Sequence, residues 1–237
     1  AVGFAEKKSK TDENKREGEQ TVALKRYAET NLEGATITGD ALNNNKPQAH
    51  AITQAGGHYF LQLKNENRHA YKAADRLAQE GSPFTHTEEP DTAHGRFDQR
   101  NIEVYPFEPL EANLPGCRSL AVIRRTRTTD PDEMAQIASF TTDHPPEKGC
   151  AQTFAELARG HWGGCEIRNH WVGDHCMRED KTRPKNHNIN CALAGVRVCL
   201  IPIKANVFAH ESWPSIQERC QRDPTIAFKA ITKLRSK

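Results

Sequence analysis

The sequence predicts an α/β protein in which a mixed sheet is flanked by helices. Residues 35–64 read as a strand, a helix and a second strand, because two β-favouring runs enclose a segment with Pro47 in its first turn and two glycines at its end. From Phe97 onward, apolar runs between turn residues predict an antiparallel β section. The residues after position 150 return to helical patterns, so helices and strands both contribute.

Taken in order, the elements begin with a loop over residues 5–19, which are too polar for a core. The first half then contains a helix, a strand, a helix, a strand, a polar helix and a long surface loop: Gln20–Thr30, Ala35–Thr38, Pro47–Gln54, His58–Lys64, Glu66–Gln79 and Gly81–Gly95. The two strands and the helix between them form a βαβ unit.

The second half begins with three predicted antiparallel strands: Asn101–Tyr105, Arg118–Thr126 and Met134–Phe140. A linker with two prolines, a helix and a polar loop follow: Thr141–Gly149, Ala151–Gly160 and residues 181–190. Cys191–Ile203 is strongly apolar, so we expect a buried helix or strand there. One more short helix, Ser215–Cys220, is expected before a basic tail.

The amino-acid composition argues for an intracellular protein and against a membrane protein. The chain has 237 residues and a net charge of +2, so charge alone selects no partner, although basic residues gather in three clumps along the chain. Seven cysteines without a CxxC pair predict reduced, intracellular thiols. A mean hydropathy of −0.79 and the lack of a signal-peptide core argue against a membrane protein, and we expect no membrane partner.

The most unusual chemistry lies in His161–Asp180, which contains acidic side chains, histidines, cysteines and two of the three tryptophans. If this segment is helical, Glu166, His170 and Asp174 follow one another at i, i+4 steps and form a polar stripe. Such a stripe suits a divalent metal or a proton transfer. Asp40 is a second candidate, because it follows a strand at the edge where α/β sheets bind ligands; a turn-capping role is the plainer alternative.

Other interpretations of these residues stay open. His161, Cys165, His170 and the His175–Cys176 pair contain ligand types for zinc, but their spacing matches no zinc knuckle. Two tryptophans in the segment, Trp162 and Trp171, suit either base stacking or a protein core. The arginines Arg96, Arg124, Arg125 and Arg127 suit either phosphate contacts or a solvated strand edge.

Four ordered blocks carry a resemblance. They are EGATITGDALNNNKPQAHAITQAGGHYFLQLKNEN, HGRFDQR, LPGCRSLAVIRRTRT and ARGHWGGCEIRNHWVGDHCMRED. In sequence and order they resemble the DDE transposases of the H-repeat-associated, ISAs-type insertion-sequence family, over nearly the whole chain. The family patterns are TGDAL followed by GGdY and KgNQ, then HGRiEtR, and finally RxHWxIEN followed by LHW.

The resemblance implies an RNase H-like fold: a mixed sheet flanked by helices, with a mainly β insertion between the second and third acidic residues. According to this resemblance, residues 1–96 are part of the core and residues 97–150 are the insertion. Residues 151–237 are the catalytic-Glu helix and the C-terminal helical part. Asp40 matches the Asp of GDAL and Glu166 the Glu of HWxIEN, so both are implied catalytic and metal-binding residues. Two Mg²⁺ or Mn²⁺ ions would serve metal-dependent DNA strand cleavage and joining at insertion-sequence ends.

The partners implied are double-stranded DNA, as element inverted repeats and target, and a second copy in a homodimer. The location implied is the bacterial cytoplasm, in association with the nucleoid. Seven residues are implied or suggested DNA contacts: Arg96, Arg124, Arg125, Arg159, His161, Trp162 and Arg168. His170 and Asp174, on the same stripe as Glu166, are expected to be supporting residues of the site.

Two departures from the family pattern matter. The family's first catalytic Asp lies upstream of the GDAL block, and no such motif occurs here; Asp12 has a charged-loop setting and is rejected as a substitute. We therefore expect weak metal binding and little turnover, and a catalytically inactive remnant that keeps DNA binding or only the fold is the alternative function. HWGGCE also has one residue more than HWxIE, so we expect a kink or bulge near Gly163 and Gly164.

Overall fold

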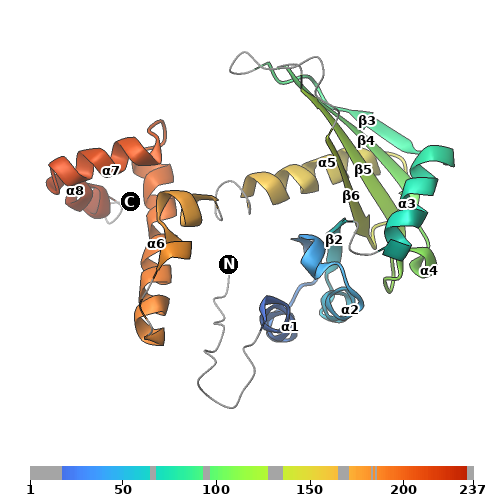
Figure 1. The fold of residues 1–237 in the computed structure, drawn as a ribbon, viewed down its shortest axis with the longest axis horizontal. Helices are drawn as coiled ribbons and strands as arrows, with labels where there is room; N and C mark the ends of the chain where they lie inside the picture. Colours follow the sequence, from blue (N-terminus) through green and yellow to red (C-terminus); the bar gives the residue numbers. More distant parts are fainter. Residues whose placement is uncertain are drawn as a thin grey trace. The chain divides into compact units, whose positions relative to one another are not determined.

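A computed structural model describes residues 18–64, 68–92, 97–127, 136–164, 171–182, 184 and 186–233. The chain divides into two compact units, Ala1–His161 and Trp162–Lys237, and each is described by itself. The first unit is α/β, as predicted, and the second is helical in its described residues (Figure 1).

In its described residues, the first unit is built on a six-stranded mixed sheet with the order β1-β2-β6-β5-β4-β3. Its strands are β1 (Thr36–Gly39), β2 (His58–Leu63), β3 (Phe84–Thr87), β4 (Asp98–Pro106), β5 (Ser119–Arg127) and β6 (Gln136–Thr142). Strands β1 and β2 are parallel, and every other neighbouring pair is antiparallel. The predicted βαβ unit and antiparallel section are therefore confirmed, and they belong to one continuous sheet.

Helices cover both faces of this sheet (Figure 1). They are α1 (Glu19–Glu29), α2 (Lys46–Gln54), α3 (Arg68–Glu80), the short α4 (Pro109–Ala112) and α5 (Cys150–Gly160). The main core contains Ile52 of α2 and Ala74 of α3 packed with Tyr59, Leu61 and other strand residues. On the opposite face, Phe154 of α5 lies 5.7 Å from the Phe60 ring, and Phe60 stacks on Phe140 at 4.5 Å.

The βαβ connection begins and ends where the sequence indicates. Asn45 caps α2 by accepting a hydrogen bond from Gln48 N, and Pro47 lies in the first turn, where a missing N–H costs nothing. After α2, Gly56 has a φ of +83°, a left-handed conformation that glycine adopts without a Cβ clash. This short connection returns the chain to β2, directly beside β1.

The second unit contains π-helical Val172–Cys176, a 3₁₀ turn (Glu179–Lys181), and helices α6 (His187–Val207), α7 (Trp213–Arg222) and α8 (Thr225–Lys233). The sequence interpretation correctly expected α7, but α8 was missed. It was also wrong about burial: the helix around Cys191–Ile203 begins earlier, at His187, and much of it is exposed.

Helix α6 has one further property. Within the described residues, Asn188–Val207 is long and apolar enough to cross a membrane, with a mean hydropathy of 1.2 and none of that window buried. Length and composition do not distinguish a membrane span from a helix whose apolar side packs on another protein surface.

Candidate functional site

Asp40 lies directly after β1 and is the N-cap of a 3₁₀ turn, Ala41–Asn43. Its Oδ1 accepts hydrogen bonds from Leu42 N at 3.1 Å, Asn43 N at 3.3 Å and Asn43 Nδ2 at 3.0 Å. Within the described part of the chain, Oδ2 has no hydrogen-bond partner. The capping role is therefore present, and it leaves one oxygen of a half-buried carboxylate for another partner.

Asn44 and Asn45, the next two residues after Asn43, fix the turn that carries Asp40. Asn44 is 92% buried, and its Nδ2 donates to the carbonyl oxygens of Leu61 (3.3 Å) and Gln62 (3.0 Å) and to Thr141 Oγ1 (3.0 Å). Asn45 Nδ2 donates to Leu42 O at 3.0 Å. Because these bonds reach β2 and β6, the position of Asp40 is set by three strands.

The donor set beside Asp40 is made of hard oxygens. Asp40 offers Oδ2, and the Oδ1 atoms of Asn43 and Asn44 are buried and have no hydrogen-bond partner among the residues that the structure describes. Carboxylate and amide oxygens are the ligands that Mg²⁺ and Ca²⁺ prefer, so the residues present fit a hard divalent cation. However, no cluster of three His, Cys, Asp or Glu side chains with metal-binding geometry occurs among the residues that the structure describes. Asp40 alone is an incomplete ligand set.

Four of the predicted site residues lie outside the described residues: Arg96, Glu166, Arg168 and His170. The pairing of Asp40 with Glu166 therefore stays a prediction. His161, another of the predicted site residues, is described by the structure. Its Nδ1 lies 3.3 Å from Thr38 Oγ1, two residues before Asp40, and its side chain is buried. This contact holds His161 against β1.

The extra residue in HWGGCE coincides with a change of helix type. Helix α5 ends at Gly160, and residues 161–164 form a π-helical turn. A π-turn accommodates one additional residue relative to an α-helix. The expected bulge near Gly163 and Gly164 is therefore confirmed.

Arg159, predicted to contact DNA, is paired with a buried carboxylate. Its Nε donates to Glu88 Oε1 at 2.7 Å and its Nη2 lies 2.6 Å from Glu88 Oε2. This hydrogen bond is the main cause that raises the pKa of Arg159. Glu88 is 8% exposed and also lies 3.5 Å from Arg100. The contact ties α5 to the residue that follows β3.

Arg124 and Arg125 lie on opposite faces of the sheet, because neighbouring strand residues alternate. Arg124 Nε donates to both carboxylate oxygens of Glu103 at 3.1 Å. Arg125 forms a bidentate ion pair with Asp98. The Asp98 carboxylate also lies near Arg100 and Arg127. The hydrogen bond from Arg125, helped by the charges of Arg100 and Arg127 and opposed by burial, holds the pKa of Asp98 below its usual range. One flat DNA backbone cannot contact both arginines.

Within His161–Asp180, the structure describes Trp162, Trp171 and Asp174, whereas Glu166 and His170 of the predicted polar stripe lie outside the described residues. Trp162 is half-buried. Trp171 is 49% exposed and stacks on His175, with ring centroids 5.5 Å apart. Asp174 is exposed within a π-helical turn. Trp171 is therefore not a core residue of the described second unit.

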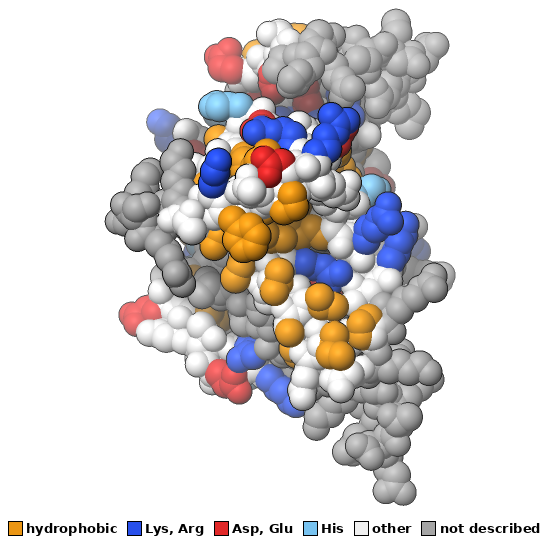
Figure 2. Space-filling model, turned by 90° about the vertical axis from the view of Figure 1, so that its left-hand side faces the viewer, with side chains coloured by type: hydrophobic (Ala, Val, Ile, Leu, Met, Phe, Trp, Pro, Cys, Tyr) orange, Lys and Arg blue, Asp and Glu red, His pale blue; other side chains and the backbone are white. Residues whose placement is uncertain are grey.

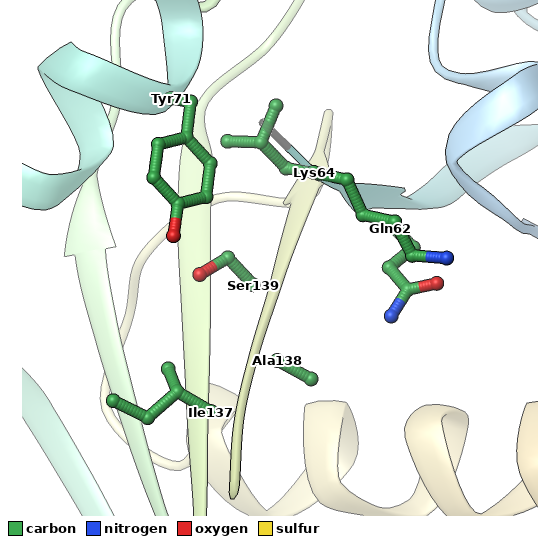
Figure 3. Close-up of a pocket in the computed structure, with 7 residues that line it drawn as sticks. Gln62, Lys64, Tyr71, Ile137, Ala138 and Ser139 are labelled. Atoms are coloured by element: carbon green, nitrogen blue, oxygen red, sulfur yellow. The ribbon is translucent and has the colours of Figure 1, made fainter. Parts of the chain in front are cut away.

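A shallow pocket of about 330 Å³ lies at the carboxyl end of β2, the same sheet edge as Asp40 (Figure 3). It is lined by β2, β6 and α3 residues, including Gln62, Lys64, Tyr71 and Ser139. A lysine and two hydroxyl groups at this edge suit an anionic group. Sequence reasoning missed this pocket, although the rule that ligands bind at the carboxyl ends of parallel strands could have indicated it.

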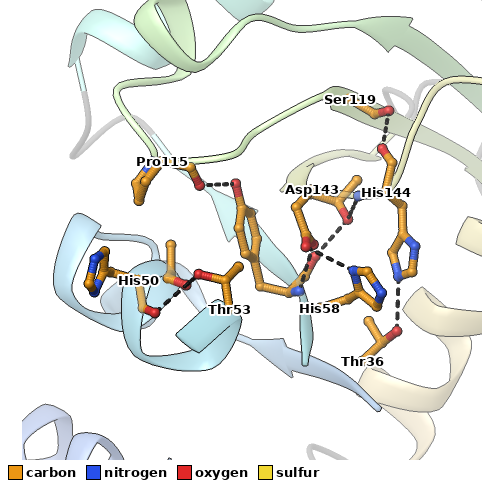
Figure 4. A network of polar contacts seen from close by, with 11 residues as sticks. Thr36, His50, Thr53, His58, Pro115, Ser119, Asp143 and His144 are labelled. Atoms are coloured by element: carbon orange, nitrogen blue, oxygen red, sulfur yellow. Dashed lines mark hydrogen bonds and ion pairs between the residues drawn. The ribbon is translucent and has the colours of Figure 1, made fainter. Parts of the chain in front are cut away.

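A second missed cluster lies at the opposite end of the parallel pair (Figure 4). His58 Nδ1 lies 2.9 Å from Asp143 Oδ2, and His144 Nε2 lies 2.9 Å from Thr36 Oγ1. The two imidazole rings are 4.3 Å apart. Burial, followed by the neighbouring His58, lowers the pKa of His144, and Asp143 opposes this effect. In each of the two hydrogen bonds the partners are more than eighty positions apart in sequence. No local sequence motif therefore indicates that they meet.

Comparison with known proteins identifies little. No protein family model matches the chain. The chain is similar to an uncharacterized protein in the dhlA 3′ region of Xanthobacter autotrophicus, with 31% identity over 120 residues. The match covers 48% of this chain and 40% of that protein, so the chain spans less than half of its length.

Proposed function

We propose that this chain is a DNA transposase of the DDE type, or a fragment of one, with an RNase H-like fold. The observation that supports it best is the placement of Asp40. It follows the first strand of a parallel pair, in a turn fixed by Asn43 and Asn44, with Oδ2 available to a further partner. By the resemblance, Asp40 matches the second acidic residue of the family's triad, so a carboxylate oxygen available here is what the proposal needs.

In this proposal β1 is a central strand, although in the described residues it lies at the edge of the sheet. The unpaired edge of β1 would accept the strand that carries the first acidic residue, and Glu166 would supply the third. Asp40 and Glu166 would hold divalent cations, which supply charge stabilisation at the transferring phosphoryl group. Asn43 and Asn44 would keep the Asp40 carboxylate oriented.

The face of the sheet against α5 is the better candidate for DNA. It carries Arg100, Arg125, Arg127 and Arg159 around Asp98 and Glu88, with Asp91 nearby. Positive charge exceeds negative charge by one there, so phosphates would compete with carboxylates for oriented guanidinium groups.

The DNA part of the proposal is tested by binding of the full chain to a labelled duplex over a salt series. Wild type should bind with a salt slope of several units, and Arg125→Ala should reduce that slope by about 1. Arg124→Ala is the matched control, because Arg124 lies on the other face and pairs with Glu103. Equal losses in both variants would assign the effect to general charge, and binding by neither wild type nor variants would refute the proposal.

The catalytic part is tested with a labelled terminal inverted repeat and Mn²⁺. The chain should bind this DNA and cleave it little, and any cleavage should disappear in Asp40→Ala. Strand nicking that persists in Asp40→Ala would refute the role of Asp40.

A second function is favoured by the same ion pairs. Every described arginine of the predicted DNA-contact set is held by a carboxylate. A catalytically inactive remnant that keeps only the fold would use them as structural contacts. It predicts duplex binding no tighter than that of an unrelated protein of the same net charge.

A further inference from the structure

A pocket lined by two tryptophans, Trp171 and Trp213, lies within the second unit. Its volume is about 570 Å³, and small-molecule sites in proteins occupy about 300 to 1,000 Å³. Trp171 and the buried Val172 form one part of its wall, the end of α6 with Ile201 forms another, and Trp213 at the start of α7 completes it. We call this cavity the tryptophan pocket.

The walls of the tryptophan pocket are held by contacts that lie outside it. Gln217 of α7 donates from Nε2 to Cys176 O at 2.7 Å, which ties α7 to the π-helical turn that follows Trp171. His175 stacks on Trp171 with ring centroids 5.5 Å apart, and this contact limits rotation of the indole. Neither Gln217 nor His175 lines the pocket, so both contacts can persist when a ligand enters.

The polar atoms of the pocket are mainly donors with unused capacity. The indole N–H groups of Trp171 and Trp213 donate no hydrogen bond within the part of the chain that the structure describes. Lys204 is half-buried and donates from Nζ to Ala209 O at 3.3 Å, which leaves two of its three ammonium protons. Glu211 also lines the pocket, but its carboxylate is paired with Arg219. The charge left for a ligand is therefore the positive charge of Lys204.

These groups favour a ligand with a flat ring and one negative charge. Indole rings offer faces and edges to a planar aromatic ring, and Val172 and Ile201 add apolar contact. Tryptophan faces also attract cations, but Lys204 would repel a cation here. A nucleic-acid strand needs a basic groove that follows several phosphates, whereas Lys204 is the one basic residue among the described residues that line this pocket. A small molecule therefore fits better than a strand.

We propose that the tryptophan pocket binds a small planar aromatic monoanion, such as an aryl carboxylate. The ring lies against the indoles of Trp171 and Trp213, and the carboxylate accepts hydrogen bonds from Lys204 Nζ and from an indole N–H. This site does not depend on the proposed reaction at Asp40. Loss of DNA binding or cleavage would leave the pocket intact, and an empty pocket would leave the Asp40 assignment intact.

Titration calorimetry of the full chain with 2-naphthoate tests the proposal. We expect one site per chain, with a dissociation constant on the order of 0.1 mM for a ligand of this size. 2-Naphthamide has the same ring system without the charge and should bind about fivefold more weakly. Cyclohexanecarboxylate keeps the charge but has no planar ring, and it should bind about tenfold more weakly.

Two substitutions then locate the site. Trp213→Leu keeps an apolar side chain but removes the stacking ring, so 2-naphthoate should bind about tenfold more weakly. Lys204→Met keeps the apolar stem and removes the charge. It should weaken binding of 2-naphthoate about fivefold and leave binding of 2-naphthamide unchanged. Circular dichroism shows whether both variants keep their helices.

Control variants are needed because the surface also exposes apolar groups. Figure 2 shows apolar side chains gathered on one face of the molecule, with Lys and Arg side chains beside them. Such a surface can attract aromatic anions without forming a site. Phe228→Leu and Lys229→Met are the matched controls, since both residues are exposed on α8 and neither lines the pocket. Both variants should bind 2-naphthoate as wild type does.

Four results would overturn the proposal. The first is the absence of 2-naphthoate binding to wild type at millimolar concentration. The second is equal affinity for 2-naphthoate and 2-naphthamide, and the third is an equal loss in Trp213→Leu and Phe228→Leu. The fourth is a single-stranded oligonucleotide that binds more tightly than 2-naphthoate and is lost in Trp213→Leu, because this result would assign the pocket to nucleic acid.

Discussion

At the scale of single residues, His144 makes the first unit sensitive to acid. Its pKa is lowered by burial and by His58, so the unfolded chain, in which histidine titrates near about 6.5, binds the proton more readily. The stability is therefore complete above that pH and falls as the pH drops from it through the lower pKa of the folded state. The groups facing His144 are His58, Asp143, Thr36 and the ring of Phe154.

We expect His144→Gln to flatten this dependence. Hydrogen exchange of peptides covering β1 and β2, measured between about pH 7 and 5, should accelerate less on acidification in the variant than in wild type. His69→Gln, at an exposed position of α3, is the control and should behave as wild type. An unchanged pH dependence in His144→Gln would contradict the assignment.

Asn44 is a second residue with a specific expected cost. Asn44→Ala removes three hydrogen bonds from one buried amide and should lower the free energy of unfolding by about 2 kcal/mol. Asn44→Asp keeps the shape but sets a carboxylate against two carbonyl oxygens, so its loss should be larger. Urea unfolding followed by circular dichroism measures both; an aspartate variant as stable as wild type would contradict the assigned hydrogen bonds.

At the scale of elements, the end of α3 depends on a close approach. A Cβ at Gly81 would lie 2.6 Å from Leu77 O and 2.8 Å from the Tyr105 ring, and backbone and buried ring have little room to move. We expect Gly81→Ala to cost about 2 kcal/mol or more. Gly160→Ala, in α5 with nothing within 4 Å of the added Cβ, should be neutral or stabilise by up to about 1 kcal/mol. Thermal unfolding of both variants tests the contrast.

Most elements follow from local patterns. Both ends of α2 were predictable because local residues set them. The helix starts at Asn45 and Pro47, and it stops before Gly56. Strand β3 was missed because Phe84–Thr87 is short and acquires its structure by pairing with β4. Helix α8 was missed because its pattern is brief and follows Pro224 closely. The burial expected for α6 was wrong. An apolar composition indicates that a helix contacts an apolar surface, but it does not say whether that surface is the protein's own core.

At the scale of the whole molecule, the two units differ in how much apolar surface they bury. Among the described hydrophobic residues of the second unit, the buried ones are Val172, Ile216 and Ala230, whereas the first unit has a large core. We expect amides of α6, α7 and α8 to exchange with solvent faster than those of β2 and β5. Equal exchange in both units would contradict this expectation.

The candidate site was only partly predictable. The position of Asp40 after a strand followed from hydrophobic patterning, and the bulge at 161–164 followed from one extra residue. The ion pairs of Arg124, Arg125 and Arg159 did not follow, because each partner is at least twenty-one residues away in sequence. Alternation along β5 does separate Arg124 from Arg125, once the strand is recognised. Proximity of Asp40 and Glu166 stays a prediction.

The bond between Asn44 and Thr141 links the turn that holds Asp40 to β6, in addition to the backbone pairing of β6 with β2. Strand β6 runs the length of the antiparallel section and ends beside β2, where Thr141 accepts the Asn44 amide. A displacement of β6 along its axis would therefore shift the turn that holds Asp40, since a packed interior transmits strain rather than absorbing it. We therefore expect a ligand that displaces β6 to change the orientation of the Asp40 carboxylate, through this buried amide and through β2.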